Sequence, residues 1–350
     1  MIEHFLDDFC SSIREDVNKA VQDIDADNGI SSIMGSITDF FANNVYALIF
    51  ALNIYDRNLD NRIISERLKS HGIDMTALQL VINKKYSDGG MLIRLFLTTF
   101  VFYMSIFHME KKSIINSPSC EDIKNINSVI SKIVKQGIGY SVKENTINFE
   151  KLEKQVDGIA LNAETGQLFK AVAEAVAEAG PWNVSMDMVA KKMGFCKSSL
   201  YGHFKNRKDM LRRLFETEFK RIIEFARQGI SLSSDASEQL YLGIFSISLY
   251  LRLRPEILVA IDWIRTRNLD LGKPEKKVEI FRLFEDVDFE PMKEACEEEK
   301  MRISHWILFL LTNILMQPVS SEHNLEYGGQ NNNIRLLYKF IISGLGGFKR

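Results

Sequence analysis

Hydrophobic positions recur with a helical period along most of this chain. The pattern is densest between residues 163 and 223, where three apolar runs are separated by short breaks. From Leu168 to Ala179 the apolar residues keep to one helix face, and Gly180-Pro181 ends that predicted helix. We therefore expect several helices packed into about sixty residues, and the rest of the chain is interpreted around them.

Two short helices and a longer one follow in the same window. Ser185 is a predicted N-cap, because a hydroxyl there can accept from a free backbone N–H. Gly194 stands where a tight interhelical turn requires a positive φ. A short helix is expected from Lys197 to Phe204, and Asn206 is the predicted cap of the next helix. This order predicts a helix-turn-helix.

The same window is strongly basic, although the whole chain carries a formal net charge of −2. One acidic residue, Asp209, lies among eight basic ones between positions 191 and 213, so the window carries +7 and the remainder −9. A basic island in an acidic chain is typical of a phosphate-binding face, and the alternative is a solvated charged helix surface. The basic residues are Lys191, Lys192, Lys197, Lys205, Arg207, Lys208, Arg212 and Arg213.

The stretch from Gly194 to Leu211, GFCKSSLYGHFKNRKDML, resembles the DNA-binding signature of the TetR family of bacterial transcriptional regulators. About ten positions of the signature agree, among them the Leu-Tyr pair and the His-Phe pair. Cys196 and Arg207 depart mildly from it, since a small or polar residue and a Lys are more usual there. The resemblance implies an all-α protein with a helix-turn-helix domain and a helical domain for effector binding and dimerisation.

Roles can be assigned within this window. The N-terminal end of the short recognition helix is expected to meet base edges in the major groove. The resemblance implies that Tyr201 and His203 contact phosphates and that Arg207 or Lys208 adds charge, while Leu200 and Phe204 belong to the core; Tyr201 could alternatively be a packing residue. The expected DNA-binding residues are Ser185, Lys197, Ser198, Ser199, Tyr201, His203, Lys205, Arg207 and Lys208.

The rest of the composition excludes several classes of protein. The four cysteines are scattered and form no CxxC pair or His/Cys cluster, so we expect no metal, no cofactor and no disulfide framework. The acidic N-terminus is unlike a signal peptide, which favours a cytoplasmic location. No nucleophile–base pair or phosphate loop is visible, so we do not expect an enzyme.

Two apolar stretches require comparison with membrane spans. Residues 91–107 and 301–316 are 17 and 16 residues long and include charged or titratable side chains such as Arg94 and His305. Both are shorter than the roughly 20 residues that a span needs. We therefore expect buried helices and no membrane partner.

These two stretches also resemble each other at an offset of 210 residues. Residues 126–140 resemble 333–347 at an offset of 207, with Gly137 and Gly139 falling on Gly344 and Gly346, and residues 4–13 resemble 214–223. A nearly constant offset at three places predicts an internal repeat.

The repeat and the resemblance together predict four segments. Residues 1–140 would be a first helical regulatory or dimerisation domain without a helix-turn-helix, 141–162 a polar linker, 163–223 the helix-turn-helix domain, and 224–350 the effector-binding and dimerisation domain. The first copy would lack its helix-turn-helix either naturally or because this sequence starts downstream of the natural N-terminus. The chain could pair as a homodimer or fold as an intramolecular pseudo-dimer.

The sequence does not identify the effector, but a stripe of aromatic residues could line an apolar pocket for it. At helical spacing such residues more often form a core. The candidates are Tyr241, Phe245, Tyr250 and Trp263.

The sequence thus predicts a TetR-like transcriptional regulator that binds a double-stranded DNA operator. By analogy with the family it would be a repressor released by a small-molecule effector. The alternative is an interaction protein of the same fold that has lost operator binding and pairs with another regulator.

Overall fold

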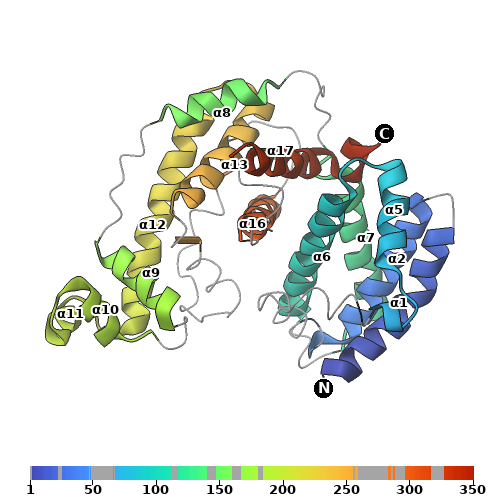
Figure 1. Ribbon diagram of the computed structural model, residues 1–350, viewed down its shortest axis with the longest axis horizontal. Coiled ribbons are helices and arrows are strands. Elements are labelled where there is room, and N and C mark those ends of the chain that lie inside the picture. The colour runs from blue at the N-terminus through green and yellow to red at the C-terminus, as the bar shows by residue number, and fades with distance from the viewer. Residues whose placement is uncertain are drawn as a thin grey trace. The chain divides into compact units, whose positions relative to one another are not determined.

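The structure is a computed structural model in which most of the described residues are helical and none lies in a strand (Figure 1). It describes residues 2–22, 26–46, 48, 66, 68–111, 117–139, 147–159, 167–179, 184–254, 257–258, 283–284, 287, 296–316 and 327–350. The all-α class expected from the helical periodicity is confirmed. Two compact units divide the chain, Met1–Ser141 with Lys339–Arg350, and Val142–Tyr338.

The first unit is a helical bundle whose main helices lie alongside one another in Figure 1. α1 packs on α2, and α7 contacts both α2 and α6. Its core includes the contacting rings of Phe41 and Phe100, whose centroids are 5.5 Å apart. The helices are α1 (Ile2–Gln22), α2 (Ala26–Asn43), α5 (Met75–Lys85), α6 (Gly89–Lys111) and α7 (Cys120–Gln136), joined by the 3₁₀ helix η2 (Gly344–Phe348).

Helix α6 is longer than the 17-residue apolar stretch indicated. It has 23 residues and, within the described part of the chain, is the helix long and apolar enough to cross a membrane. Our expectation that this stretch falls short of a span was therefore wrong in length, because the helix extends beyond the apolar run at both ends. Half of its most apolar window is buried, against α2, α5 and α7 among others, as is typical of a core helix.

The second unit contains the predicted helix-turn-helix and the helices that follow it. α9, α10 and α11 gather at the start of the long helix α12, and α12 packs along α13 (Figure 1). The last helix, α17, continues from this unit into the segment assigned to the first unit. The helices are α8 (Phe149–Asp157), α9 (Gln167–Ala179), α10 (Met186–Met193), α11 (Lys197–His203), α12 (Arg207–Ile230), α13 (Ala236–Arg252), α16 (Glu297–Leu315) and α17 (Tyr327–Ser343).

Helix α8 lies inside the segment 141–162, which we expected to be a linker. Asn148 caps it by accepting a hydrogen bond of 3.0 Å from the Lys151 N–H. Leu152 and Val156 are buried at the spacing of one helix face, and α8 packs on α13. This part of the polar segment is therefore a packed helix.

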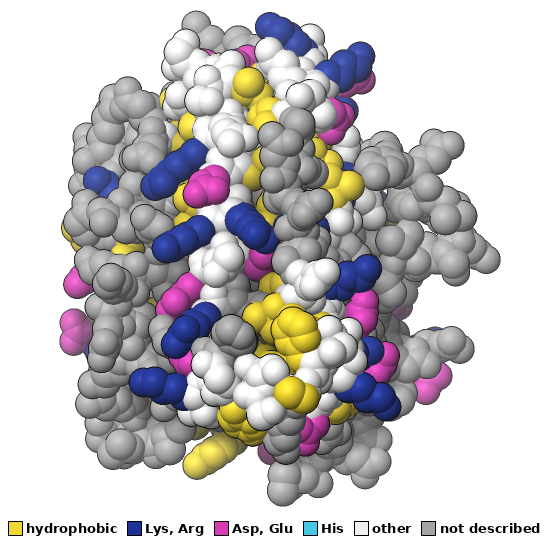
Figure 2. Space-filling model, turned by 90° about the vertical axis from the view of Figure 1, so that its left-hand side faces the viewer, with side chains coloured by type: hydrophobic (Ala, Val, Ile, Leu, Met, Phe, Trp, Pro, Cys, Tyr) yellow, Lys and Arg dark blue, Asp and Glu magenta, His cyan; other side chains and the backbone are white. Residues whose placement is uncertain are grey.

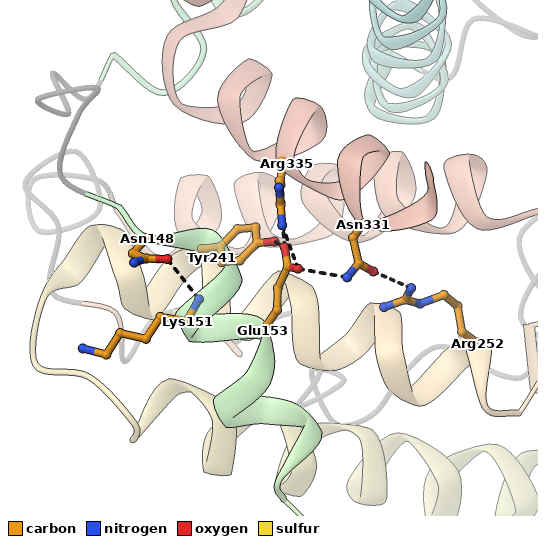
Figure 3. A network of polar contacts seen from close by, with 7 residues as sticks. All are labelled: Asn148, Lys151, Glu153, Tyr241, Arg252, Asn331 and Arg335. Atoms are coloured by element: carbon orange, nitrogen blue, oxygen red, sulfur yellow. Dashed lines mark hydrogen bonds and ion pairs between the residues drawn. The ribbon is translucent and has the colours of Figure 1, made fainter. Parts of the chain in front are cut away.

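A buried polar network fixes α8 to its neighbours (Figure 3). Glu153, 5% exposed, accepts hydrogen bonds from the Tyr241 hydroxyl at 2.6 Å and from the Asn331 amide at 2.9 Å. The Arg335 guanidinium donates to both of its carboxylate oxygens, at 2.7 and 2.9 Å. Arg252 extends the network by donating to Asn331 at 2.8 Å. Because the carboxylate is paired and hydrogen-bonded, it can be buried at an acceptable free-energy cost.

Candidate nucleic-acid interface

A small apolar core holds the three short helices of the helix-turn-helix window together. Phe169 of α9, Val189 of α10 and Leu200 of α11 are 2%, 0% and 1% exposed. Met210, in the first turn of α12, is fully buried. Leu200 was expected in this core, and it fixes one face of α11 so that the opposite face is directed to solvent.

The turn between α10 and α11 has the geometry that a helix-turn-helix needs. Ser185 caps α10 by accepting a hydrogen bond of 3.3 Å from the Met188 N–H. Gly194 ends α10 with φ +69°, in the left-handed region where glycine has no Cβ penalty. The Phe195 N–H then donates to the Ala190 carbonyl at 2.9 Å, which closes the turn.

The entry into α12 is fixed by two side chains. Asn206 accepts a hydrogen bond of 2.9 Å from the Asp209 N–H and so caps the helix, as its sequence position indicated. The buried Asp209 carboxylate accepts from the Lys205 backbone N–H at 3.2 Å and pairs with Arg213 at 3.2 Å. These bonds tie the loop after α11 to the first turns of α12.

The exposed face of α11 is polar and aromatic. Ser198 and Ser199 are exposed, and Tyr201 keeps 48% of its surface in solvent. Tyr201 is therefore not a core residue in this structure. Two hydroxyls and a phenol on the exposed face of a short helix supply hydrogen-bonding groups suited to base edges and phosphates.

Cys196, the residue before α11, is exposed and has an unusual environment. Its Sγ lies 3.1 Å from the Ser198 hydroxyl and 3.0 Å from that of Ser199. Hydrogen bonds from these two hydroxyls lower the pKa of the Cys196 thiol to about 7. As part of the signature Cys196 is only a mild departure, although the two serines that stand two and three residues after this thiol, at a predicted helix start, are visible in the sequence.

Basic side chains are distributed around this face. Figure 2 shows dark-blue Lys and Arg side chains on the side of the molecule where α10 and α11 lie, with acidic side chains among them. Lys191 and Lys205 are exposed, and Arg207 is partly exposed. Lys192, by contrast, pairs with Glu178 of α9 at 2.5 Å. The basic island is therefore partly neutralised by acids from outside the window and by Asp209 within it.

Three expected DNA-binding residues, Lys197, His203 and Lys208, lie on described helices, but their side chains lie outside the described part. The structure brings Ser198, Ser199 and Tyr201 together on α11, and places Lys205 and Arg207 at the entry to α12. Ser185 lies at the start of α10. The DNA contacts of all nine residues stay predictions.

The family model of the bacterial regulatory proteins of the tetR family matches residues 168–214. The match begins in α9 and ends in the second turn of α12, so it covers the helices described above. The chain carries a TetR-family domain.

Part of this chain, which carries the TetR-family domain, is similar to a curated regulator protein. The chain is 32% identical over 78 residues to the fatty acid metabolism regulator protein of Bacillus subtilis (strain 168), a match over 22% of this chain and 40% of that protein. The match thus spans less than half the length of the relative.

Three solved structures are also similar to this TetR-domain chain. The fatty acid degradation regulator FadR from Bacillus halodurans is 16% identical at a TM-score of 0.38, covering 52% of this chain and 98% of that one. TetR-family regulators from Haemophilus influenzae Rd and Marinobacter aquaeolei VT8 are 17% and 14% identical at TM-scores of 0.39 and 0.38. Each of these two matches covers 55% of this chain and 97% of the other protein.

The aromatic residues considered for an effector pocket lie in the core of the second unit. Tyr241, Phe245 and Tyr250 are at most 1% exposed, and Trp263 lies outside the described residues. Tyr241 donates to Glu153, and Tyr250 donates to Glu218 at 3.0 Å. Burial and these carboxylates raise the pKa of both phenols. In the described part these side chains fill the helix interface, and their contact with an effector stays a prediction.

Among the described residues, no three His, Cys, Asp or Glu side chains are grouped so that they could hold a metal ion.

Proposed function

We propose that this chain is a sequence-specific DNA-binding transcriptional regulator that uses α10 and α11 as its DNA-binding elements. The observation that carries the proposal is the arrangement of α11 inside the segment that the TetR family model matches. Buried Leu200 holds one face, while Ser198, Ser199 and Tyr201 are presented on the other. Lys205 and Arg207 follow at the start of α12, whose N-terminal dipole favours a phosphate.

We propose that this regulator acts in the cytoplasm as a repressor, and that a small-molecule effector releases it from its DNA operator. Because the similar protein of Bacillus subtilis is named a regulator of fatty acid metabolism, genes of fatty acid metabolism are the first targets to test. An effector acts only to the extent that it binds one conformation of the protein better than the other.

The proposal can be tested by selecting sequences from a random duplex DNA library with the purified chain. We expect one enriched motif, and binding to it that weakens steeply as salt rises. The matched variants are Tyr201→Ala on α11 and Tyr338→Phe in the buried core, of which only the first should lose binding. No enrichment and no binding at low salt would overturn the proposal and favour the interaction protein without operator binding.

A further inference from the structure

The end of α17 meets the end of α7 at two glycines. Gly137 follows α7 with φ +59°, and Gly344 follows α17 with φ +55°. Both are buried, and a Cβ on either would clash with backbone of the other segment. A Cβ on Gly137 would lie 2.8 Å from the Gly344 nitrogen, and one on Gly344 would lie 2.7 Å from the Gly137 nitrogen. The two backbones therefore need glycine on both sides.

The contact is reciprocal in the numbering of the predicted repeat. Gly137 and Gly344 are equivalent at the offset of 207 residues, as are Val134 and Ile341. A Cβ on Gly137 would meet the Ile341 carbonyl, and a Cβ on Gly344 would meet the Val134 carbonyl. Gly137 thus meets the equivalent of Val134, and Val134 meets the equivalent of Gly137. This is the contact pattern of a two-fold interface between identical subunits.

Burial along the two helices follows the same equivalence. Ile130 and Val134 of α7 are fully buried, as are Leu337 and Ile341 of α17, which are their equivalents. The Ile138 N–H donates to the Ile341 carbonyl at 2.8 Å, so backbone hydrogen bonding joins the two segments.

A second pair of helices, α2 and α13, is compatible with the repeat. α2 and α13 begin at Ala26 and Ala236, 210 residues apart, and each packs on the helix before it. Four buried positions of α2 fall on buried positions of α13, although α13 is buried at every residue from 240 to 251, so this agreement is compatible with the offset and does not select it. The pairs are Met34 with Ile244, Ile37 with Ile247, Thr38 with Ser248, and Phe41 with Leu251.

We propose that the joint between α7 and the end of α17 is an internal pseudo-two-fold interface. The second copy of the repeat occupies the surface that the first copy would otherwise offer to another chain. The partner of this surface is therefore the chain's own equivalent segment, and the chain needs no second copy to cover it. The proposal does not depend on DNA binding.

The first test is the mass of the purified chain without DNA, by sedimentation velocity over a wide range of concentration. We expect the single-chain mass, 40.2 kDa, at every concentration. A stable two-chain mass would overturn the proposal, since the joint would then not make the chain self-sufficient.

The second test compares two glycines that share a positive φ, of which only one makes the close approach. Gly137 and Gly139 both have positive φ, but a Cβ on Gly139 would meet no atom within 4 Å. In amide hydrogen exchange, Gly137→Ala should lose protection in peptides from both 130–138 and 339–350, whereas Gly139→Ala should retain it. Gly344→Ala against Gly346→Ala probes the other side of the joint, because Gly346 has room for a Cβ, although Gly344 alone of these two has a positive φ. Equal protection within each pair of variants would overturn the joint.

Discussion

Glu153 of α8 and Arg335 of α17, 182 residues apart in the chain, form a two-pronged ion pair in the second unit. The Glu153 side chain is 7% exposed and that of Arg335 is 30% exposed. A short helix from a polar stretch is thereby fixed to the helix whose end forms the glycine joint. The carboxylate is satisfied by three neighbours, so its loss affects more than one helix contact.

Glu153→Gln should destabilise the fold by about 2–4 kcal/mol, because the Arg335 charge would lose its partner. Burial by itself raises the pKa of Glu153, but hydrogen bonds from Arg335 and Tyr241 outweigh it, so the pKa lies below the ordinary 4.5. The stabilisation is therefore complete above pH 4.5 and is lost as pH falls through the folded pKa. Urea unfolding at several pH values would measure this difference, which should shrink in acid.

Glu150→Gln is the matched control for that variant, because Glu150 lies on the same helix and is exposed. If the two substitutions changed the free energy of unfolding equally, the ion pair would not stabilise the protein.

Gly194→Ala should destabilise the helix-turn-helix by about 1–2 kcal/mol, since alanine is strained at φ +69°. Gly202→Ala should have the opposite sign and stabilise α11 by about 0.5–1 kcal/mol, because Gly202 lies within the helix and has open space around its Cβ position. Hydrogen exchange of peptides from 184–206 would compare them. A stabilised Gly194→Ala variant would contradict the left-handed turn.

Lys205→Ala should weaken binding to all DNA sequences alike and lower the slope of log affinity against log salt by about 1, as expected for loss of one phosphate contact. Ser199→Ala should instead relax the preference among sequences with little change in salt dependence. Fluorescence anisotropy with the selected duplex measures both effects. Lys220→Ala removes an exposed charge further along α12 and should leave the slope unchanged.

Alkylation of Cys196 should block DNA binding, because the adduct would stand at the start of α11. The rate with iodoacetamide should rise as pH increases through about 7, where the thiol becomes a thiolate. Peptide mass spectrometry would follow the reaction at this residue, and DNA binding by Cys196→Ser should resist the reagent. Loss of binding in that variant on alkylation would place the sensitive group elsewhere.

The helix-turn-helix could be predicted from sequence because each of its boundaries depends on local chemistry. Ser185, Gly194 and Asn206 act within three or four residues of themselves, and the structure confirms all three as caps or turn. α8 was missed because its stability comes from residues far along the chain. Leu152 and Val156 are too few to reveal an amphipathic face, and no local pattern links Glu153 to Arg335.

The same distinction explains the aromatic stripe of α13. Helical spacing correctly indicated that Tyr241, Phe245 and Tyr250 share one helix, but a core and a pocket have the same spacing. Long-range hydrogen bonds to Glu153 and Glu218 give the two phenols a structural partner, and neither carboxylate could be matched to them from the sequence.

The glycine joint also has a consequence for how this chain can change over generations. In a dimer of identical chains, one mutation alters both sides of a two-fold contact at once. Here Gly137 and Gly344 are specified by separate codons, so a mutation alters one side of the joint while the other side stays constant. If the proposed repeat holds, its two copies could diverge elsewhere in sequence, while the joint would keep glycine at both positions where the backbones touch.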